Sequence, residues 1–164
     1  MNESYLSALR RPNKATIDQV VLHNLHAHTD NRGWLTELLR NDSEHYAGFG
    51  QLYMVTNYQR NVVRAYHMHL KQDEFFFVVN GTIQFILVDE RPSSPTYRQL
   101  NAFVLTSERP QALYVPRGVQ HGSMALTDGA QIVAVTNQPY NAEKPDEIRI
   151  PSDSYGDVWA LGGW

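Results

Sequence analysis

The sequence predicts an all-β domain, a barrel or a sandwich built from many short strands. Segments rich in Val, Phe and Tyr follow one another at close spacing between residues 50 and 136. Asn80-Gly81 separates two apolar runs, and such a step is a strong hairpin signal because both residues tolerate positive φ. Prolines and glycines punctuate the gaps and leave little room for a helix after residue 45.

The elements are expected in the following order. A short helix is predicted near residues 2–9. Strands are predicted at 50–59, 62–70, 74–90 (with the Asn80-Gly81 turn near its middle), 102–106, 112–116 and 130–136. The length of 164 residues suits one core. We therefore predict a single domain over 1–164, with an N-terminal arm (1–25), a barrel (26–138) and a C-terminal wrap (139–164).

Composition excludes several classes of function. The net charge is -3, with 14 basic and 17 acidic residues and no Lys/Arg run, so a nucleic-acid partner is not expected. No apolar run approaches the roughly 18 residues of a membrane span. The chain has no cysteine, which excludes thiolate ligands and nucleophiles. With a polar start that lacks a signal segment, this predicts a cytoplasmic protein. A small anionic ligand held by a few arginines stays open as a partner, because it needs only local charge.

Four residues form a possible metal set. His67 and His69 are two apart, so on a strand they share a face. Four residues separate His69 from Glu74, and six separate Glu74 from Gly81. His121 ends the segment 116–121, Pro-Arg-Gly-Val-Gln-His. Three imidazoles and one carboxylate suit a divalent transition ion such as Fe, Mn, Ni, Cu or Zn, with positions left open for substrate. The alternative is a polar pocket without metal.

These two motifs resemble those of the cupin superfamily, whose fold is a double-stranded β-helix, or jelly-roll barrel. The fold class implied is therefore an all-β, cupin-type jelly roll with short peripheral helices. In the metal-binding cupins, residues at the positions of His67, His69, Glu74 and His121 ligate one ion.

A closer resemblance is to the dTDP-4-dehydrorhamnose 3,5-epimerase family, which is itself cupin-fold. It is carried by the segments 30–37 (DNRGWLTE), 62–67 (VVRAYH), 88–97 (VDERPSSPTY), 113–122 (LYVPRGVQHG) and 139–150 (PYNAEKPDEIRI). The resemblance implies an isomerase that acts on a nucleotide-linked 4-keto-6-deoxysugar. It also implies that no metal cofactor is required and that the protein is a homodimer.

The resemblance assigns roles to individual residues. His67 matches the catalytic base and His121 the second active-site histidine. Arg64 matches an arginine that contacts the diphosphate, and Arg32 matches one that reaches the nucleotide of the neighbouring subunit. Apart from the resemblance, Tyr66 at the barrel mouth and Gln72 in the turn after His69 are expected to contact the substrate. The alternatives are structural filling for Tyr66, and orientation of His69 or a solvated turn for Gln72.

Three positions depart from the family's pattern. The catalytic tyrosine aligns near Val133, and the lysine that steadies the enolate aligns near Glu74. The carboxylate that pairs with the catalytic histidine lies in a C-terminal extension beyond Trp164. Two further functions therefore stay open beside the epimerase: a metal-dependent cupin oxygenase or isomerase, and a non-catalytic module that binds sugar nucleotides.

Overall fold

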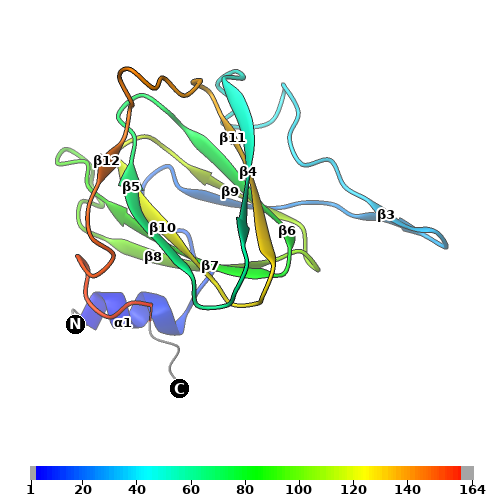
Figure 1. Cartoon of the computed structure of the whole chain (residues 1–164), viewed down its shortest axis with the longest axis horizontal. Helices are drawn as coiled ribbons and strands as arrows, with labels where there is room; N and C mark the ends of the chain where they lie inside the picture. Colours follow the sequence, from blue (N-terminus) through cyan, green and yellow to red (C-terminus); the bar gives the residue numbers. More distant parts are fainter. Residues whose placement is uncertain (1–2, 160–164) are drawn as a thin grey trace.

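Two five-stranded antiparallel sheets face each other and form a jelly-roll barrel (Figure 1). The computed structural model describes residues 3–159. The strand order of one sheet, called the β6 sheet here, is β1 (Val21–Asn24), β9 (Gln111–Val115), β6 (Glu74–Asn80), β11 (Ala130–Thr136), β4 (Gln51–Asn57). The order of the other, the β5 sheet, is β12 (Ile148–Arg149), β5 (Val63–Met68), β10 (Val119–Ala125), β7 (Thr82–Asp89), β8 (Leu100–Thr106). The predicted fold class is confirmed.

The core lies between the two sheets, because alternate residues of each strand point inward. Phe76 and Phe85 come from opposite sheets, and their ring centroids are 5.5 Å apart. The main cluster adds buried aliphatic and aromatic side chains from both sheets, among them Ile83, Leu87, Phe103, Leu105, Leu113, Val115 and Ile132. This core borders the cavity that contains His67 and His121, since Phe76, Phe85 and Ile132 of the cluster also line that cavity.

A tight turn forms at Asn80-Gly81, but the predicted hairpin is wrong, because β6 pairs with β9 and β11 while β7 pairs with β8 and β10. Gly81 has φ +71°, and a Cβ there would lie 2.2 Å from Thr127 Oγ1, so both conformation and space favour glycine. The turn joins β6 to β7 and sends them into different sheets. It therefore carries Glu74 and the apolar strand β7 to opposite walls of the barrel.

Several strands were absent from the sequence prediction. β10 reads VQHGSMA, in which polar and small residues hide the alternation, yet all seven residues are buried. β1 lies within the predicted arm 1–25 but pairs with β9, so the sheet begins before residue 26. β12, in the predicted C-terminal wrap, pairs with β5. The predicted N-terminal helix is present as α1 (Glu3–Arg10) and contacts β8.

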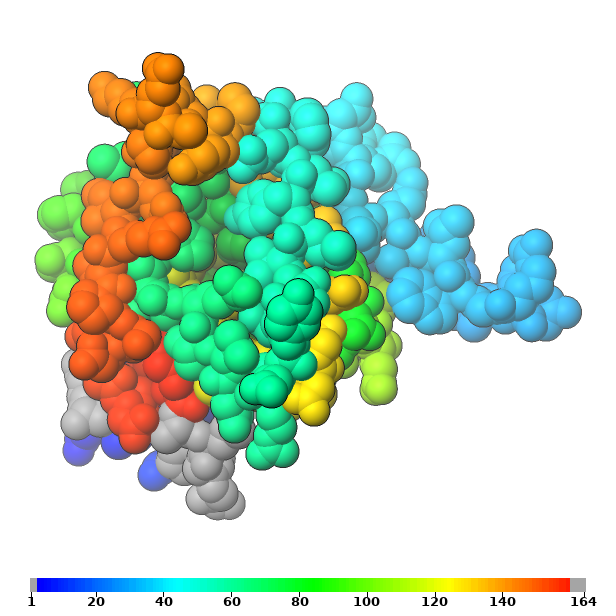
Figure 2. All heavy atoms as spheres, in the orientation of Figure 1, coloured from blue at the N-terminus to red at the C-terminus, as the bar shows by residue number. Residues whose placement is uncertain are grey.

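A two-stranded hairpin leaves the body of the barrel. It consists of β2 (His28–Asp30) and β3 (Gly33–Leu35), and both space-filling and cartoon views show it projecting into open space (Figures 1 and 2). Trp34 and Leu35 are 55% and 64% exposed. All residues of the two strands are exposed, so the hairpin offers apolar side chains to its surroundings.

Candidate active site

The pairing of β5 with β10 brings two histidines face to face. His67 and His121 are partners in the register, and their ring centroids are 4.1 Å apart. Gly122 permits this approach, since a Cβ there would lie 2.4 Å from Ala65 Cβ and 2.9 Å from Ala65 Cα. The sequence therefore fixes the histidine pair through strand register and one small residue.

Glu74 enters the site from the other sheet. It begins β6, is only 1% exposed, and divides its two oxygens between different partners. Oε1 accepts hydrogen bonds from the Tyr53 hydroxyl (3.0 Å) and from Gln72 Nε2 (3.1 Å). Oε2 lies 2.8 Å from His121 Nε2 and 3.5 Å from His69 Nε2. The carboxylate is thus held from one side and presented to the histidines on the other.

His69 lies just past the end of β5 and is oriented by Asp146. Its Nδ1 contacts the backbone oxygen of Asp146, so Nε2 is the nitrogen that faces Glu74. The Asp146 carboxylate accepts hydrogen bonds from the backbone N–H groups of Leu70, Lys71 and Gln72 at 2.8–3.1 Å. One residue of the C-terminal segment therefore fixes the whole turn between His69 and Glu74.

Burial and neighbouring charges shift the pKa values of the site residues in different directions. Burial, with a further contribution from His121, lowers the pKa of His67 to about 3, so His67 is neutral at pH 7. Burial alone would lower the pKa of His121, but the charge of Glu74 outweighs it and raises that pKa. Burial alone would raise the pKa of Glu74, but its histidine neighbours, first His121, lower it. These shifts favour a charged His121 beside an ionised Glu74, next to a neutral His67.

The four predicted ligands converge. One ligand atom from each of His67, His69, Glu74 and His121 lies within 4.8 Å of all the others. The contact between His121 Nε2 and Glu74 Oε2 is short but lacks hydrogen-bond alignment, so both atoms are buried without a hydrogen-bond partner. Such atoms require a proton or a cation between them.

A cavity of about 510 Å³ opens on the histidine pair. Its lining includes His67, His121, Tyr53, Arg64 and Arg149. Arg64 donates to Asn57 Oδ1 (2.9 Å), and Arg149 pairs with Glu147 (2.9 Å). Arg149 was not predicted from the sequence. Its signal, an arginine in a segment that pairs with β5, is visible only once β12 is placed.

The other predicted substrate contacts lie in different surroundings. Tyr66 borders the cavity but is 1% exposed, and its ring packs against Tyr155 and Trp159. Gln72 is buried and supports Glu74. Arg32 lies at the tip of the projecting hairpin, where it pairs with Asp30 (2.6 Å). Arg32 is therefore not brought to the cavity of its own chain.

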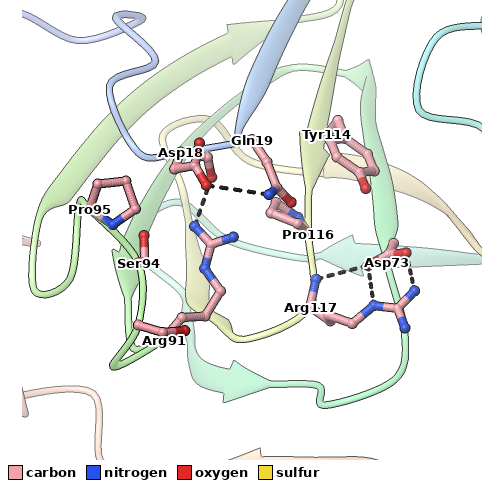
Figure 3. A pocket seen from close by; sticks show the side chains of 10 residues that line it. Asp18, Gln19, Asp73, Arg91, Ser94, Pro95, Tyr114, Pro116 and Arg117 are labelled. Carbon is pink, nitrogen blue, oxygen red and sulfur yellow. Dashed lines mark hydrogen bonds and ion pairs between the residues drawn. The ribbon is translucent and has the colours of Figure 1, made fainter.

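A second cavity of about 490 Å³ holds no predicted site residue. It is lined by Asp18, Gln19, Arg91 and Arg117 among others (Figure 3). Both of its arginines are already paired, Arg117 with Asp73 and Arg91 with Asp89. Its charges are thus neutralised within the protein, which leaves the His67 cavity as the site with chemistry to offer.

Comparison with known proteins places this geometry in a family. The model of the family dTDP-4-dehydrorhamnose 3,5-epimerase matches residues 14–161. The spore coat polysaccharide biosynthesis protein SpsL of Bacillus subtilis (strain 168) is 36% identical over 138 residues, 84% of this chain and 91% of SpsL. The probable low-salt glycan biosynthesis epimerase Agl13 of Haloferax volcanii is 33% identical over 141 residues, 84% and 89% of the two chains. The dTDP sugar isomerase of Desulfovibrio desulfuricans G20 superposes with a TM-score of 0.75 at 26% identity, covering 89% and 91%.

Fold, histidine pair and cavity together define a cupin-fold isomerase. The chain belongs to the dTDP-4-dehydrorhamnose 3,5-epimerase family. The predicted family and enzyme class are confirmed. Epimerases of this family work without a metal cofactor. Within residues 3–159 no helix is long and apolar enough to cross a membrane, and the cytoplasmic location stays a prediction.

Proposed function

We propose that this protein epimerises a 4-keto-6-deoxysugar carried on a nucleoside diphosphate, with His67 as the base. The observation that carries the proposal is a neutral imidazole lining a cavity of about 510 Å³ beside a charged partner. A hydrogen on carbon next to a ketone is acidic enough for a histidine to remove. His67 is neutral at pH 7, so its lone pair is available to accept that proton.

The His121–Glu74 pair supplies the stabilising charge. Removal of the proton puts negative charge on the ketone oxygen, and the family uses a lysine there, at the position of Glu74. In this chain the charge of Glu74 raises the pKa of His121 and so favours its charged form, which places the positive charge on a ring whose centroid is 4.1 Å from that of His67. A preorganised imidazolium on a buried side chain stabilises an enolate as an ammonium would. With Glu74 in place of the family's lysine, the stabilising positive charge is thus supplied by His121 instead of by residue 74.

Arginines at the cavity serve the diphosphate. Arg64 lines the cavity and is fixed by Asn57, and a guanidinium offers paired donors to phosphate oxygens. Tyr66 lies at the cavity wall, while Gln72 acts through Glu74. Arg32 is assigned to the site of a second copy of the chain, because its hairpin projects away from the barrel.

Solvent exchange tests this function. Incubated in heavy water with a dTDP-linked 4-keto-6-deoxyglucose, the wild-type protein is expected to place deuterium next to the ketone, detected by proton NMR. His67→Ala should lower the exchange rate by about 10²-fold or more. His45→Ala is the matched control, because His45 stacks on Tyr114 outside the cavity. Absence of exchange with several nucleotide sugars would leave the non-catalytic binding module.

A homodimer completes the proposal. β4 is an edge of the β6 sheet, and its outward residues Leu52 and Met54 are 59% and 60% exposed. An apolar groove of about 310 Å³ on this face is lined by Leu38, Phe49, Leu52, Phe77 and Val133 among others. An apolar edge strand with an apolar groove on the same face is a surface that a second copy would cover. Sedimentation as a single chain at micromolar concentration would contradict the dimer.

The second candidate is a divalent transition ion held by His67, His69, Glu74 and His121. The donor set fits, since the four ligand atoms lie within 4.8 Å of one another and two of them are buried without a hydrogen-bond partner. His69 and His121 direct their Nδ1 atoms to backbone oxygens, which leaves Nε2 to ligate. A bound ion would polarise a substrate carbonyl, and His67 would then be a ligand instead of a base.

Cobalt titration separates the two candidates. Protein made without a histidine tag is titrated with Co²⁺, and the visible absorption of the bound ion is followed. The metal candidate predicts saturation at one ion per chain, lost in Glu74→Gln and kept in His26→Ala, whose histidine is exposed. No absorption change on titration, together with deuterium exchange that survives a chelator, would exclude the metal and leave the epimerase.

A further inference from the structure

Inversion of a carbon centre demands a proton donor that the histidine pair does not supply. The proton leaves one face of the carbon, so its replacement must arrive at the other. His67 and His121 both belong to the β5 sheet. The donor must therefore come from the facing β6 sheet. This inference rests on the proposed epimerase function.

The wall of the cavity on the β6 side contains one candidate. The lining residues described there are Tyr53 and Val55 of β4, Phe76 of β6 and Ile132 of β11. Among these four, only Tyr53 carries an O–H group. We propose that Tyr53 is the proton donor that acts opposite His67.

The local structure holds the Tyr53 hydroxyl in place. Leu52 and Met54 point outward from β4, so the alternation of the strand turns Tyr53 inward. Its hydroxyl donates to Glu74 Oε1 at 3.0 Å, and the same oxygen accepts from Gln72 Nε2. The phenol is thus protonated, oriented and anchored to the carboxylate that pairs with His121.

The family position for the tyrosine cannot serve here. Val133 is packed with Phe77 and Val135 on the outer face of the β6 sheet. Its inward neighbours Ile132 and Ala134 belong to the apolar core. A donor therefore has to come from another strand, and β4 pairs directly with β11, with Tyr53 opposite Ala134.

The step balances with water as the only co-reactant. His67 takes the proton from carbon, and the electron pair of the broken C–H bond forms the enolate. The enolate carbon then uses that electron pair to take the proton of the Tyr53 O–H bond on the opposite face, which leaves a tyrosinate and a protonated His67. His67 releases its proton to water and Tyr53 regains one from water, so the protein returns to its starting state.

Tyr53→Phe separates inversion from exchange. The variant keeps the ring, and Glu74 Oε1 keeps its hydrogen bond from Gln72, so folding should be preserved and is checked by thermal melting. In heavy water we expect deuterium uptake by way of His67 to continue within about 10-fold of wild type, while the inverted sugar falls by about 10²-fold or more. Tyr58→Phe is the control, because Tyr58 is 88% exposed.

The outcomes are distinct. If wild-type protein neither exchanges nor inverts, the proposed function fails. If wild type does both and Tyr53→Phe inverts at the wild-type rate, the assignment of Tyr53 is wrong. If Tyr53→Phe loses exchange and inversion equally while remaining folded, Tyr53 serves the site as a whole and the assignment of an opposite-face donor is likewise overturned.

Discussion

At the scale of single residues, Glu74 decides the character of the site. A lysine at this position would place a cation on the wall of the β6 sheet. Glu74 instead places an anion there, which raises the pKa of His121 and favours its charged form, while burial lowers the pKa of His67 and keeps it neutral. Two imidazoles with rings 4.1 Å apart thus acquire different roles from one carboxylate.

Asp146 is expected to position His69 and Glu74 without taking part in the reaction itself. Asp146→Ala removes the acceptor for the backbone N–H groups of residues 70–72. We expect a loss of about 1 kcal/mol of stability, as for other side chains that cap backbone donors. We expect kcat to fall by about 10-fold with KM little changed, because His69 and Glu74 are then less well held.

The measurement joins steady-state kinetics to nitrogen NMR of the histidine rings. Asp146→Asn is the control, because it keeps one side-chain oxygen as an acceptor and should lie between wild type and alanine. A wild-type His69 spectrum and a wild-type kcat in Asp146→Ala would contradict this prediction, because the turn between His69 and Glu74 would then keep its conformation without the carboxylate.

At the scale of elements, the connection between β7 and β8 depends on Asp89. This carboxylate is fully buried and accepts hydrogen bonds from Arg91, Ser94 and Thr96 at 2.6–2.9 Å. Burial alone would raise the pKa of Asp89, but these hydrogen bonds outweigh it and lower the pKa to about 2. The loop 90–99 is thus organised around one ionised group.

Linkage makes this a prediction about acid stability. Because the pKa of Asp89 is lower in the folded chain than its ordinary 3.8, its contribution is complete above pH 4 and is lost as pH falls toward 2. Asp89→Asn should therefore cost on the order of 1 kcal/mol or more at pH 7, after allowance for screening, and less near pH 2. Urea unfolding of both proteins at several pH values measures the difference. A difference that does not change with pH would contradict it.

Strand register explains how far the sequence could predict the site. The spacing of His67, His69 and Glu74, with the Asn80-Gly81 turn, encodes a local arrangement, so the convergence with His121 could be anticipated. The sequence could not predict the roles of Tyr53 and Asp146, because their partners Glu74 and His69 lie 21 and 77 positions away. It could not predict Arg149 either, because that residue reaches the site only through the pairing of β12 with β5. Nothing in spacing along the chain indicates which strands become neighbours.

The same reasoning applies to the strands. Val- and Phe-rich segments such as β6 and β7 were predicted because hydrophobic residues dominate them. β10 was missed because a strand that carries polar side chains such as Gln120 and His121 into the interior loses the apolar signature of a strand. The polar residues of the candidate site therefore hide the apolar alternation by which a strand is predicted from sequence.

At the scale of the whole molecule, the projecting hairpin allows the dimer to be tested by mixing. His67→Ala and Arg32→Ala chains should each be inactive or nearly so. If Arg32 serves the neighbouring barrel, mixed dimers contain one site with both residues, and about a quarter of all sites should regain activity after subunit exchange. Recovery is measured as deuterium exchange after the two variants are mixed. No recovery, with subunit exchange confirmed by mass, would assign Arg32 to its own chain.

The hairpin of β2 and β3 also has a kinetic consequence. If the hairpin binds the substrate of the neighbouring chain, as proposed, each site is complete only while the two chains are associated, and the specific activity should decline on dilution. Substrate, by lying across the boundary between the chains, would hold them together and restore the lost rate. At a low cellular concentration of the protein, few chains would be paired, and the activity per chain would be low.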